Sequence, residues 1–411
     1  MDTILIIGSV WPEPNSSAAG VRMLQLINIF LAQNWKITFA SSAKDSNHMT
    51  DLESLGINKV NITLNDSSFD DFITKLQPNT VLFDRFMIEE QFGWRVSKHQ
   101  PNALKILNTE DLHCIRKVRQ QAFKEKKEFT ITALKSNDIT KREIASIYRC
   151  DISLIISDYE INILEQHFGI KKKSLFYIPF LFDPITTKTK NNWLDYKERN
   201  HFITIGNFRH EPNWDSVLYL QHILWPLIKK QLPEAELHIY GAYPPPKATQ
   251  LHNTKQGFLV KGWTKDAMHV MKKAKVCLAP LRFGAGIKGK LAEAMLCGTP
   301  TVTTSIGAEG MTNKPSDWNG FIKNNDIEFA NASVQLYNKQ NIWQEAQQRG
   351  TEIINTRFKK EKYENQLIQC IIDLQSNLEE HRFKNFIGAM LQHHTLRSTE
   401  FMSRWIEEKN K

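Results

Sequence analysis

Two runs of alternating strand and helix patterns constrain this chain more than any other feature. In the first run, helix-like stretches such as residues 20–33 separate short apolar segments. These segments are TILIIG (3–8), KITFAS (36–41), TVLFD (80–84), ALKILN (103–108), ISLIIS (152–157) and SLFYIPF (174–180). Such runs are typical of strands buried on both faces, and their alternation with helices implies right-handed crossovers and a parallel sheet.

The polar segment 183–200 interrupts this rhythm and is the best candidate for a linker. The alternation then restarts, with strands expected at 201–208, 235–241, 257–263, 275–281 and 299–305, and helices at 214–232, 265–274 and 289–298. A length of 411 residues also suits two domains. We therefore predict an α/β chain whose two doubly wound parallel-sheet domains face each other across a cleft, with ligands at the carboxyl ends of the strands.

Two further segments lie outside this alternation. Residues 116–149 are charge-rich and contain neither Gly nor Pro, which indicates one or two helices with a join near residues 136–138. The stretch from about residue 341 to residue 411 is expected to be helical and to pack on the outside. Within it, Phe401, Met402 and Trp405 have the helical spacing of a core face.

The net charge and the cysteines of the chain limit the kinds of binding partner and the cellular compartment, but they do not identify a single partner. The formal charge of +9 favours anionic partners such as nucleotide phosphates, a membrane surface or nucleic acid, although an ordinary basic surface explains it equally well. The five scattered cysteines form no C-x-x-C pair, which argues against disulfides and zinc and suits the cytoplasm. No apolar window is long enough to span a bilayer, and the N-terminal apolar run lacks the basic flank of a signal peptide.

Glycines follow several of the predicted strands, where a ligand would approach the backbone. Gly20 stands at the start of a helix after the first strand, although a plain strand-to-helix turn explains it as well. In the second half, the strand at 201–205 is followed by Gly206 and Asn207, and Arg209 beyond them can reach a phosphate. Further strand ends in this half carry Gly241 and Gly262.

The densest such loop, RFGAGIKGKLAEAMLCGTPTV, spans residues 282–302. Its glycines free the backbone to curl around a ligand, while Lys288 and Lys290 supply cations for phosphates. Glu293 falls one turn inside the following helix, where its carboxylate can accept hydrogen bonds from the vicinal hydroxyls of a ribose. The glycines of this loop are Gly284, Gly286 and Gly289.

The segment GAGIKGKLAEAMLCGTPTVTTSIGAEGM (284–311) resembles the donor-binding segment of retaining glycosyltransferases of family 4, which have the GT-B fold. The resemblance covers most of residues 203–311 and continues more loosely through residues 10–20, 108–120 and 151–164. It implies a sugar-nucleotide donor bound by a C-terminal Rossmann-like domain (191–380) and an acceptor bound mainly by an N-terminal one (1–190). It also implies that residues 381–411 cross back to the N-terminal domain.

The resemblance assigns roles residue by residue. Glu293 matches the second of two spaced glutamates, the one that holds the ribose, while Ala285 stands where the first is expected. Backbone amides of residues 286–289, Ile287 among them, then contact the donor sugar. Arg209 and Lys288 match the cations that stabilise the leaving diphosphate, whose negative charge grows as the glycosidic bond breaks. No metal or other cofactor is implied, and the sequence contains no Asp-x-Asp pair.

The N-terminal half supplies the candidates for acceptor chemistry. His113 matches the histidine that lies near the transferred sugar, although Glu110 or Asp111 could equally be the important group. Asp84 and Arg85 end a predicted strand and would face the cleft. Together with Gly20 and Asp111, they form the expected acceptor side.

Together with these patterns, the resemblance implies a cytoplasmic enzyme that transfers a sugar from a nucleoside diphosphate to a glycan, a lipid-linked acceptor or a small molecule, with retention of configuration. A sugar-nucleotide epimerase of the same fold and a non-catalytic sugar-nucleotide-binding protein are the alternatives, the second because of Ala285. Whether the protein contacts the inner face of a membrane is left open by the sequence. Nucleic acid is not expected, because basic and acidic residues are interspersed and no RNA- or DNA-binding module is present.

Overall fold

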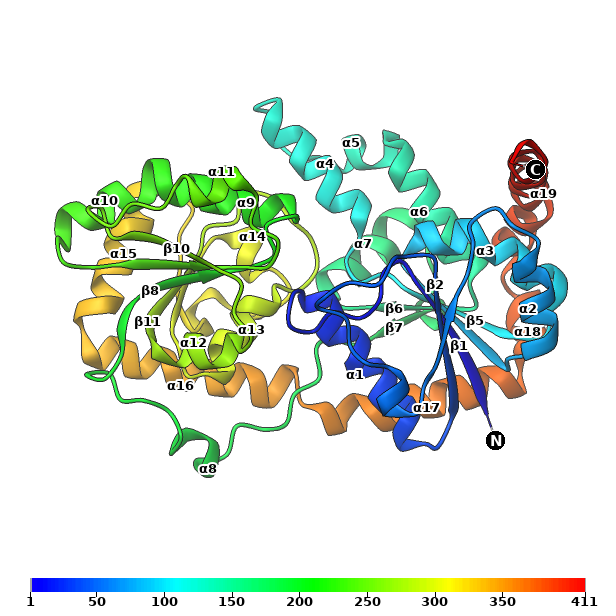
Figure 1. The fold of residues 1–411 in the computed structure, drawn as a ribbon, viewed down its shortest axis with the longest axis horizontal. Helices are drawn as coiled ribbons and strands as arrows, with labels where there is room; N and C mark the ends of the chain where they lie inside the picture. Colours follow the sequence, from blue (N-terminus) through cyan, green and yellow to red (C-terminus); the bar gives the residue numbers. More distant parts are fainter. Residues whose placement is uncertain (1, 411) are drawn as a thin grey trace.

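Two parallel sheets, one in each half of the chain, organise the molecule (Figure 1). This computed structural model describes residues 2–410, apart from the side chains of residues 394–396. The N-terminal sheet has the strand order β3-β2-β1-β4-β5-β6-β7, and the C-terminal sheet has the order β10-β9-β8-β11-β12-β13. All paired strands run parallel, so the predicted pair of doubly wound α/β domains is confirmed.

The N-terminal domain contains more elements than the apolar runs predicted. The short strand β3 was not expected, and the charge-rich segment 116–149 folds as three helices, two of which join at residue 137. The strands are β1 (Thr3–Gly8), β2 (Lys36–Ser41), β3 (Asn58–Asn61), β4 (Thr80–Asp84), β5 (Leu104–Asn108), β6 (Ile152–Ile155) and β7 (Leu175–Tyr177). The helices are α1 (Ala18–Ala32), α2 (Ser68–Leu76), α3 (Phe86–His99), α4 (His113–Lys124), α5 (Ile131–Ser136), α6 (Asp138–Arg149) and α7 (Asp158–Phe168).

The C-terminal domain follows a polar connection that contains only the short helix α8 (Thr187–Lys190). Its predicted helix at 214–232 is observed as α9 (Glu211–Tyr219) and α10 (Trp225–Gln231), joined by a π-helical turn. The strands are β8 (Asn200–Ile205), β9 (Leu237–Tyr240), β10 (Phe258–Gly262), β11 (Ala274–Ala279), β12 (Thr301–Thr303) and β13 (Gly320–Ile322). The other helices are α11 (Pro246–Thr249), α12 (Ala267–Lys273), α13 (Gly289–Leu296), α14 (Ser305–Ala308), α15 (Asp326–Asn338) and α16 (Gln340–Arg357).

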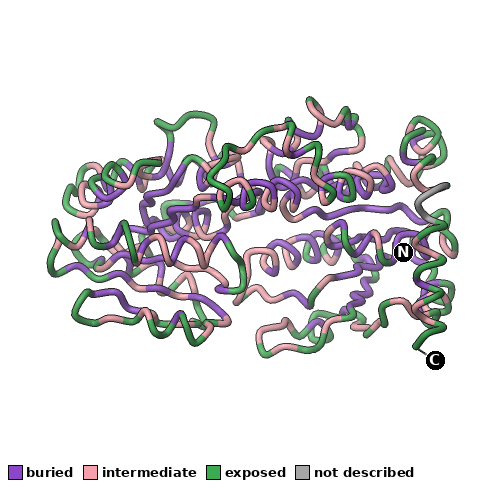
Figure 2. The backbone as a smooth tube through the Cα atoms, turned by 90° about the horizontal axis from the view of Figure 1, so that it is seen from above, coloured by how far each residue is buried: buried purple, intermediate pink, exposed green. Residues whose placement is uncertain are grey.

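Both faces of each sheet are covered, as parallel sheets require. In β1, Leu5 and Ile7 enter one hydrophobic cluster, while Ile4 and Ile6 enter a second cluster on the opposite face. The buried backbone accordingly runs through the middle of both domains, with exposed segments around them (Figure 2). The hydrophobic core therefore fixes the strands and leaves the loops at their carboxyl ends to form the site.

The chain returns to the N-terminal domain at residue 360, earlier than the predicted boundary at residue 381. Helix α17 (Lys360–Ser376) runs along the edge of the molecule beneath that domain (Figure 1). Its residues Tyr363, Leu367 and Ile371 recur every four positions and pack in the same cluster as Ile4 and Ile6. This helical stripe is the physical reason for the early crossing. The last helices, α18 (Leu378–Phe383) and α19 (Phe386–Lys409), then lie at the far end of the N-terminal domain.

The expectation that Phe401, Met402 and Trp405 form a core face is wrong. Their side chains are 64%, 59% and 59% exposed, because α19 packs against α3 and α6 through its opposite, polar side. No helix within residues 2–410 combines the length and apolar character needed to cross a bilayer.

Because α17 completes the N-terminal core, Leu367→Ala should destabilise that domain although residue 367 follows the C-terminal domain in sequence. The buried Leu367 side chain should cost about 2–5 kcal/mol on truncation, while Ile372→Ala, at an exposed position of the same helix, should cost little. Hydrogen exchange of the two variants checks this: amides of β1 and α1 should exchange faster in Leu367→Ala. Faster exchange confined to β8 and β9 would contradict the assignment.

Candidate active site

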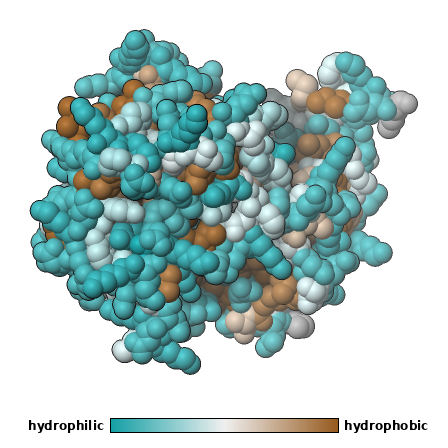
Figure 3. All heavy atoms as spheres, turned by 60° about the vertical axis from the view of Figure 1, so that its left-hand side comes forward, coloured by the Kyte–Doolittle hydropathy of each residue, from teal (hydrophilic) through white to brown (hydrophobic). Residues whose placement is uncertain are grey.

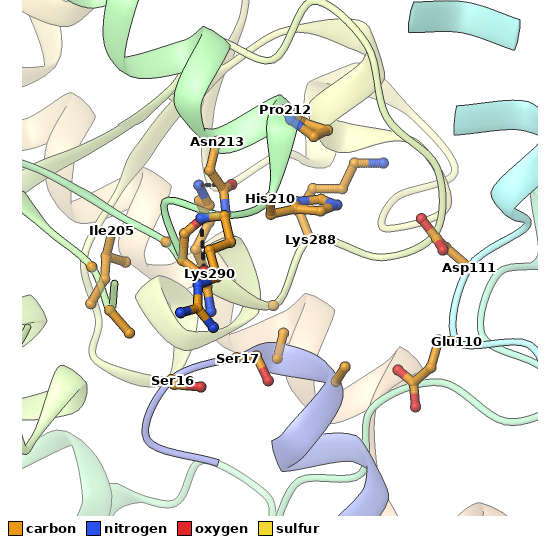
Figure 4. A pocket seen from close by; sticks show the side chains of 18 of the residues that line it. Ser16, Ser17, Glu110, Asp111, Ile205, His210, Pro212, Asn213, Lys288 and Lys290 are labelled. Carbon is orange, nitrogen blue, oxygen red and sulfur yellow. Dashed lines mark hydrogen bonds between the residues drawn. The ribbon is translucent and has the colours of Figure 1, made fainter. Parts of the chain in front are cut away.

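A cavity of about 600 Å³ lies where the carboxyl ends of the two sheets face each other. Its C-terminal wall comes from the segments after β8, β9, β10 and β11, and its N-terminal wall from those after β1, β4 and β5. Figure 4 shows His210, Asn213, Lys288 and Lys290 on the first wall, and Ser16, Ser17, Glu110 and Asp111 on the second. The outer surface is mainly hydrophilic in the view of Figure 3, with hydrophobic side chains in separate patches.

The structure brings most of the predicted site residues together around this cavity, and four of them are not part of its lining. Those that line it are Arg85, Asp111, His113, Gly206, Asn207, Arg209, Gly241, Gly284, Ala285, Ile287, Lys288, Gly289 and Glu293. Asp84, Gly20, Gly262 and Gly286 do not line it. A Cβ at Gly20 would meet the Glu13 backbone at 2.3 Å, so this glycine allows the first loop to fold onto α1.

The glycines of the loop between β11 and α13 allow the N-terminal domain to approach it. Gly286 has a φ of 62°, and a Cβ there would lie 2.8 Å from the Cβ of Asp111 in the other domain. A Cβ at Gly289 would lie 2.5 Å from the Cβ of Ala18. Ala285 itself packs in a hydrophobic cluster of the N-terminal domain. This loop is therefore both a wall of the cavity and part of the contact between the domains.

Three cationic side chains enter the cavity from the C-terminal wall. Lys288 Nζ donates to the carbonyl oxygen of Gly286 at 2.7 Å, and Lys290 Nζ donates to Oδ1 of Asn213 at 2.8 Å. Burial lowers the pKa of both amines, that of Lys290 to about 8. Arg209 stacks its guanidinium 3.7 Å from the ring centroid of Tyr243. A bound anion would stabilise the charged form of these lysines, because it compensates for their burial.

Glu293 projects into the same cavity from the second turn of α13. Burial raises the pKa of its carboxyl, against the opposing influence of Lys290. Within residues 2–410 no side chain or backbone group donates a hydrogen bond to this carboxylate. It is therefore available to accept hydrogen bonds from ligand hydroxyls.

On the N-terminal wall, His113 is the first residue of α4 and lies beside Asp111. The distance from His113 Nε2 to Asp111 Oδ1 is 3.4 Å, and Arg116 Nε donates to Asp111 Oδ2 at 2.7 Å. Burial lowers the pKa of the imidazole to about 3, despite the nearby carboxylate of Asp111. Burial would raise the pKa of Asp111, but the Arg116 guanidinium outweighs it and holds this pKa below its ordinary value. A neutral imidazole and an ionised carboxylate thus face the cavity at pH 7.

Two neighbouring acidic side chains, Glu110 and Asp84, lie deeper in this wall. Glu110 has a φ of 62° and accepts a hydrogen bond from Asn108 Nδ2 at 2.7 Å. Burial and the neighbouring charge of Asp84 raise the pKa of Glu110 to about 7. Asp84 is itself bonded to Ser9 Oγ at 3.0 Å, while Arg85 reaches the cavity above it. Glu110 rather than Asp84 is the carboxyl that a ligand would meet.

The buried carboxylate of Glu160, on α7, joins the two domains. Its Oε1 atom accepts hydrogen bonds from the amides of Leu112 and Gly286, both at 2.9 Å, and these amides belong to opposite walls. Its Oε2 atom is buried without a partner, and burial together with the charge of Asp111 raises the pKa of the carboxyl to about 8. Arg119 on α4 adds two more contacts between the domains. It pairs with Glu309 at 2.7 Å and donates to the Gly284 carbonyl oxygen at 2.9 Å.

Several of these residues lie beyond what the sequence analysis selected. Glu160 sits in the helix DYEINIL, where its apolar neighbours give no sign of a contact with residue 286. Tyr243 joins the domains because its hydroxyl donates to Glu13 at 3.0 Å, and its φ of 57° is a backbone feature that no sequence pattern reveals. Asn213 could have been found from its place soon after the glycine that follows β8. Its side chain accepts a hydrogen bond from Lys290 and so positions that lysine.

Comparisons with known proteins agree with this architecture. The family model of glycosyl transferases group 1 matches residues 199–339, which cover most of the C-terminal domain. No curated protein matches the chain by sequence. Among solved structures, sucrose-phosphate synthase from Thermosynechococcus elongatus aligns with a TM-score of 0.66 and 16% identity over 92% of this chain and 100% of that chain.

Two further solved structures are complexes with UDP. TarM of S. aureus, in complex with UDP, aligns with a TM-score of 0.66 and 12% identity over 90% of this chain and 100% of that one. HepE of Anabaena, in complex with UDP and glucose, aligns with a TM-score of 0.64 and 15% identity over 89% of this chain and 98% of that one. The chain has the GT-B fold, and these matches together support a glycosyltransferase.

The raised pKa of Glu160 makes a testable contribution to the pH dependence of stability. Because the folded-state pKa of about 8 exceeds the ordinary value of 4.5, wild-type stability should fall as pH rises through this window. Glu160→Gln cannot ionise, so it should gain stability relative to wild type between about pH 5 and about pH 8, by at most about 1.4 kcal/mol per pH unit.

Urea unfolding of both proteins across this pH range measures the effect, with Glu165→Gln as the control for loss of a carboxylate on the same helix. A constant difference between wild type and Glu160→Gln would show that Glu160 is already ionised in the folded protein at low pH.

Proposed function

We propose that this protein is a retaining glycosyltransferase that moves a sugar from a nucleoside diphosphate to an acceptor bound on the N-terminal wall. The observation that carries the proposal is the arrangement of the C-terminal wall. It directs Arg209, Lys288, Lys290 and Glu293 into one cavity at the facing ends of two sheets. The match of residues 199–339 to group 1 glycosyltransferases supports it.

The donor fits the C-terminal wall by charge and by hydrogen bonding. The diphosphate would lie against the cations, and the unpaired Glu293 carboxylate would accept from the two ribose hydroxyls. TarM and HepE are described with UDP, which makes UDP-sugars the first donors to test. The sugar would then extend toward His113 and Asp111 on the opposite wall.

Charge development on the leaving group explains why cations are placed here. As the glycosidic bond breaks, negative charge grows on the diphosphate oxygen that is released. Arg209 and Lys288 would stabilise this charge, and the α13 amino terminus at Gly289 would add partial positive charge. We propose that these groups act without a metal. The described residues contain no cluster of three or more His, Cys, Asp or Glu side chains arranged to hold one.

The N-terminal wall would orient the acceptor. Arg85, Glu110, Asp111 and His113 offer both donors and acceptors for the hydroxyls of a glycan, a lipid-linked sugar or a small molecule. The neutral imidazole of His113 can contact the transferred sugar without repelling the positive charge that develops at the anomeric carbon.

A non-catalytic sugar-nucleotide-binding protein is the second candidate, because Ala285 stands where the resemblance expects a glutamate. Ala285 lies at the cavity edge and packs against the N-terminal domain, so no carboxylate can approach the donor sugar from this position. Incubation with UDP-sugars separates the candidates. A transferase slowly releases UDP and free sugar without an acceptor, a binding protein releases neither, and an epimerase interconverts the sugars.

Glu293→Gln should weaken binding of UDP by roughly 1–3 kcal/mol, because a neutral amide replaces the charge-assisted acceptor of the ribose hydroxyls. Glu309→Gln is the matched comparison, since Glu309 lies near the loop but is occupied by Arg119. Calorimetric titration with UDP compares the two. Normal UDP binding by Glu293→Gln would show that the ribose hydroxyls are not bound by this carboxylate.

Replacing either leaving-group cation should affect turnover more than donor affinity. Arg209→Ala and Lys288→Ala should each lower kcat on the order of 10²-fold or more, with a smaller change in KM, because their charges act mainly in the transition state. Lys255→Ala, at an exposed position outside the cavity, is the control. An unchanged kcat for Lys288→Ala would remove this residue from the chemistry and leave Arg209 as the cation that acts there.

A further inference from the structure

Helix α19 is attached to the protein by its polar side. Ser403 Oγ donates to Asn65 Oδ1 at 3.1 Å, Glu407 accepts from the Ser67 amide at 3.0 Å, and Gln392 donates to the Arg149 carbonyl oxygen at 2.8 Å. These partners all belong to the N-terminal domain. The contact between α19 and the domain is therefore a row of hydrogen bonds, whereas packed surface helices usually bury an apolar stripe.

The apolar side of α19 consequently faces outward. Six large apolar side chains of α19, together with Phe383 at the end of α18, are between 44% and 88% exposed, and the helix is largely exposed in Figure 2. At 100° per residue, those on α19 fall within an arc of about 160°. We define the α19 face as these side chains: Phe383, Phe386, Ile387, Met390, Phe401, Met402 and Trp405.

Positive charge borders the α19 face at its amino-terminal end. Lys171 Nζ lies 3.5 Å from the carbonyl oxygen of Lys384, and Lys384 stands between Phe383 and Phe386 in the sequence. Lys172 and Lys173 are exposed beside it. Glu380 forms its ion pair with Lys384, and within the described residues no acidic side chain forms an ion pair with the lysines at 171–173. Exposed aromatic side chains bordered by lysines match the chemistry of an anionic membrane surface, with an apolar interior and phosphates above it.

A second copy of the chain fits this face less well. A parallel pairing of two α19 helices would bring the lysine clusters together. An antiparallel pairing would bring each cluster toward a helix end whose Arg397, Arg404 and Lys409 are matched by Glu400, Glu407 and Glu408, so it gains no net charge attraction. The parallel arrangement places like charges side by side, which costs free energy.

We propose that the α19 face docks this protein peripherally on an anionic lipid surface, with Lys171–Lys173 contacting phosphates. Docking there uses the outer end of the N-terminal domain and leaves the C-terminal domain free in solution (Figure 1). The inference is independent of the proposed sugar transfer, because none of these residues lines the cavity.

Sedimentation of the full-length protein with vesicles tests the docking. The protein should bind vesicles of phosphatidylcholine with phosphatidylglycerol and should not bind phosphatidylcholine alone. Binding should weaken as salt rises from about 0.1 M to about 0.5 M, because the Debye length shortens. Equal binding to both vesicles, or binding to neither, would overturn the proposal.

Matched variants locate the contact. Phe383→Ser with Phe386→Ser, and separately Lys171→Glu with Lys173→Glu, should each lower binding about tenfold or more. Ile327→Ser, at an exposed apolar position of the C-terminal domain, and Lys255→Glu should leave binding unchanged. UDP binding in solution should be equal in all variants, which verifies folding and keeps this result separate from the proposed function. Full vesicle binding by both double variants would contradict the assignment.

Two further measurements decide what covers the face. Brominated lipids should quench the wild-type tryptophan fluorescence more than that of Trp405→Phe, because Trp405 should enter the bilayer. In light scattering without lipid, a dimer that Phe383→Ser with Phe386→Ser dissociates would show that a second copy covers the face, and would overturn the proposal.

Discussion

The bridge formed by Glu160 between the two domains is the contact on which the geometry of the site depends. One buried oxygen accepts hydrogen bonds from the amides of Leu112 and Gly286, so it fixes the loop before α4 and the loop before α13 relative to each other. Removing a carboxylate from water is costly unless it is neutralised or fully bonded, and this one retains an unpaired oxygen. The raised pKa of the carboxyl follows from that cost, and it links closure of the domains to protonation.

This bridge requires the N-terminal domain to approach the loop before α13 closely. That approach explains Gly286 and Gly289 better than ligand binding alone. Side chains at residues 286 and 289 would collide with Asp111 and Ala18, so the domains could not close over the loop. Closure places three cations and Glu293 opposite His113, Asp111 and Glu110 across one cavity. A pocket with cations on one wall and titratable polar groups on the other suits a ligand that is anionic at one end and hydroxylated at the other.

The sequence predicted the layers of the fold well, because strand and helix periodicity are local properties. The β1 strand and the helix at Gly289 needed no knowledge of distant residues, and most of the site residues lie at strand ends that the pattern located. Contacts between distant residues could not be read in this way. Glu160 meets Gly286 only through the packing of two domains, and Leu367 joins a cluster with Ile4. Trp405 misled because the helical spacing of apolar residues does not tell which side of a helix faces the protein.

Hydrogen–deuterium exchange of the full-length protein with and without UDP tests the central claim most directly, because it reports where the ligand sits. Binding in the interdomain cavity should slow amide exchange in residues 206–213 and 284–293, which form the C-terminal wall. Strands β1 and β2 should change little. Unchanged exchange in both segments at saturating UDP, or protection confined to another region, would contradict the assignment of this cavity as the donor site.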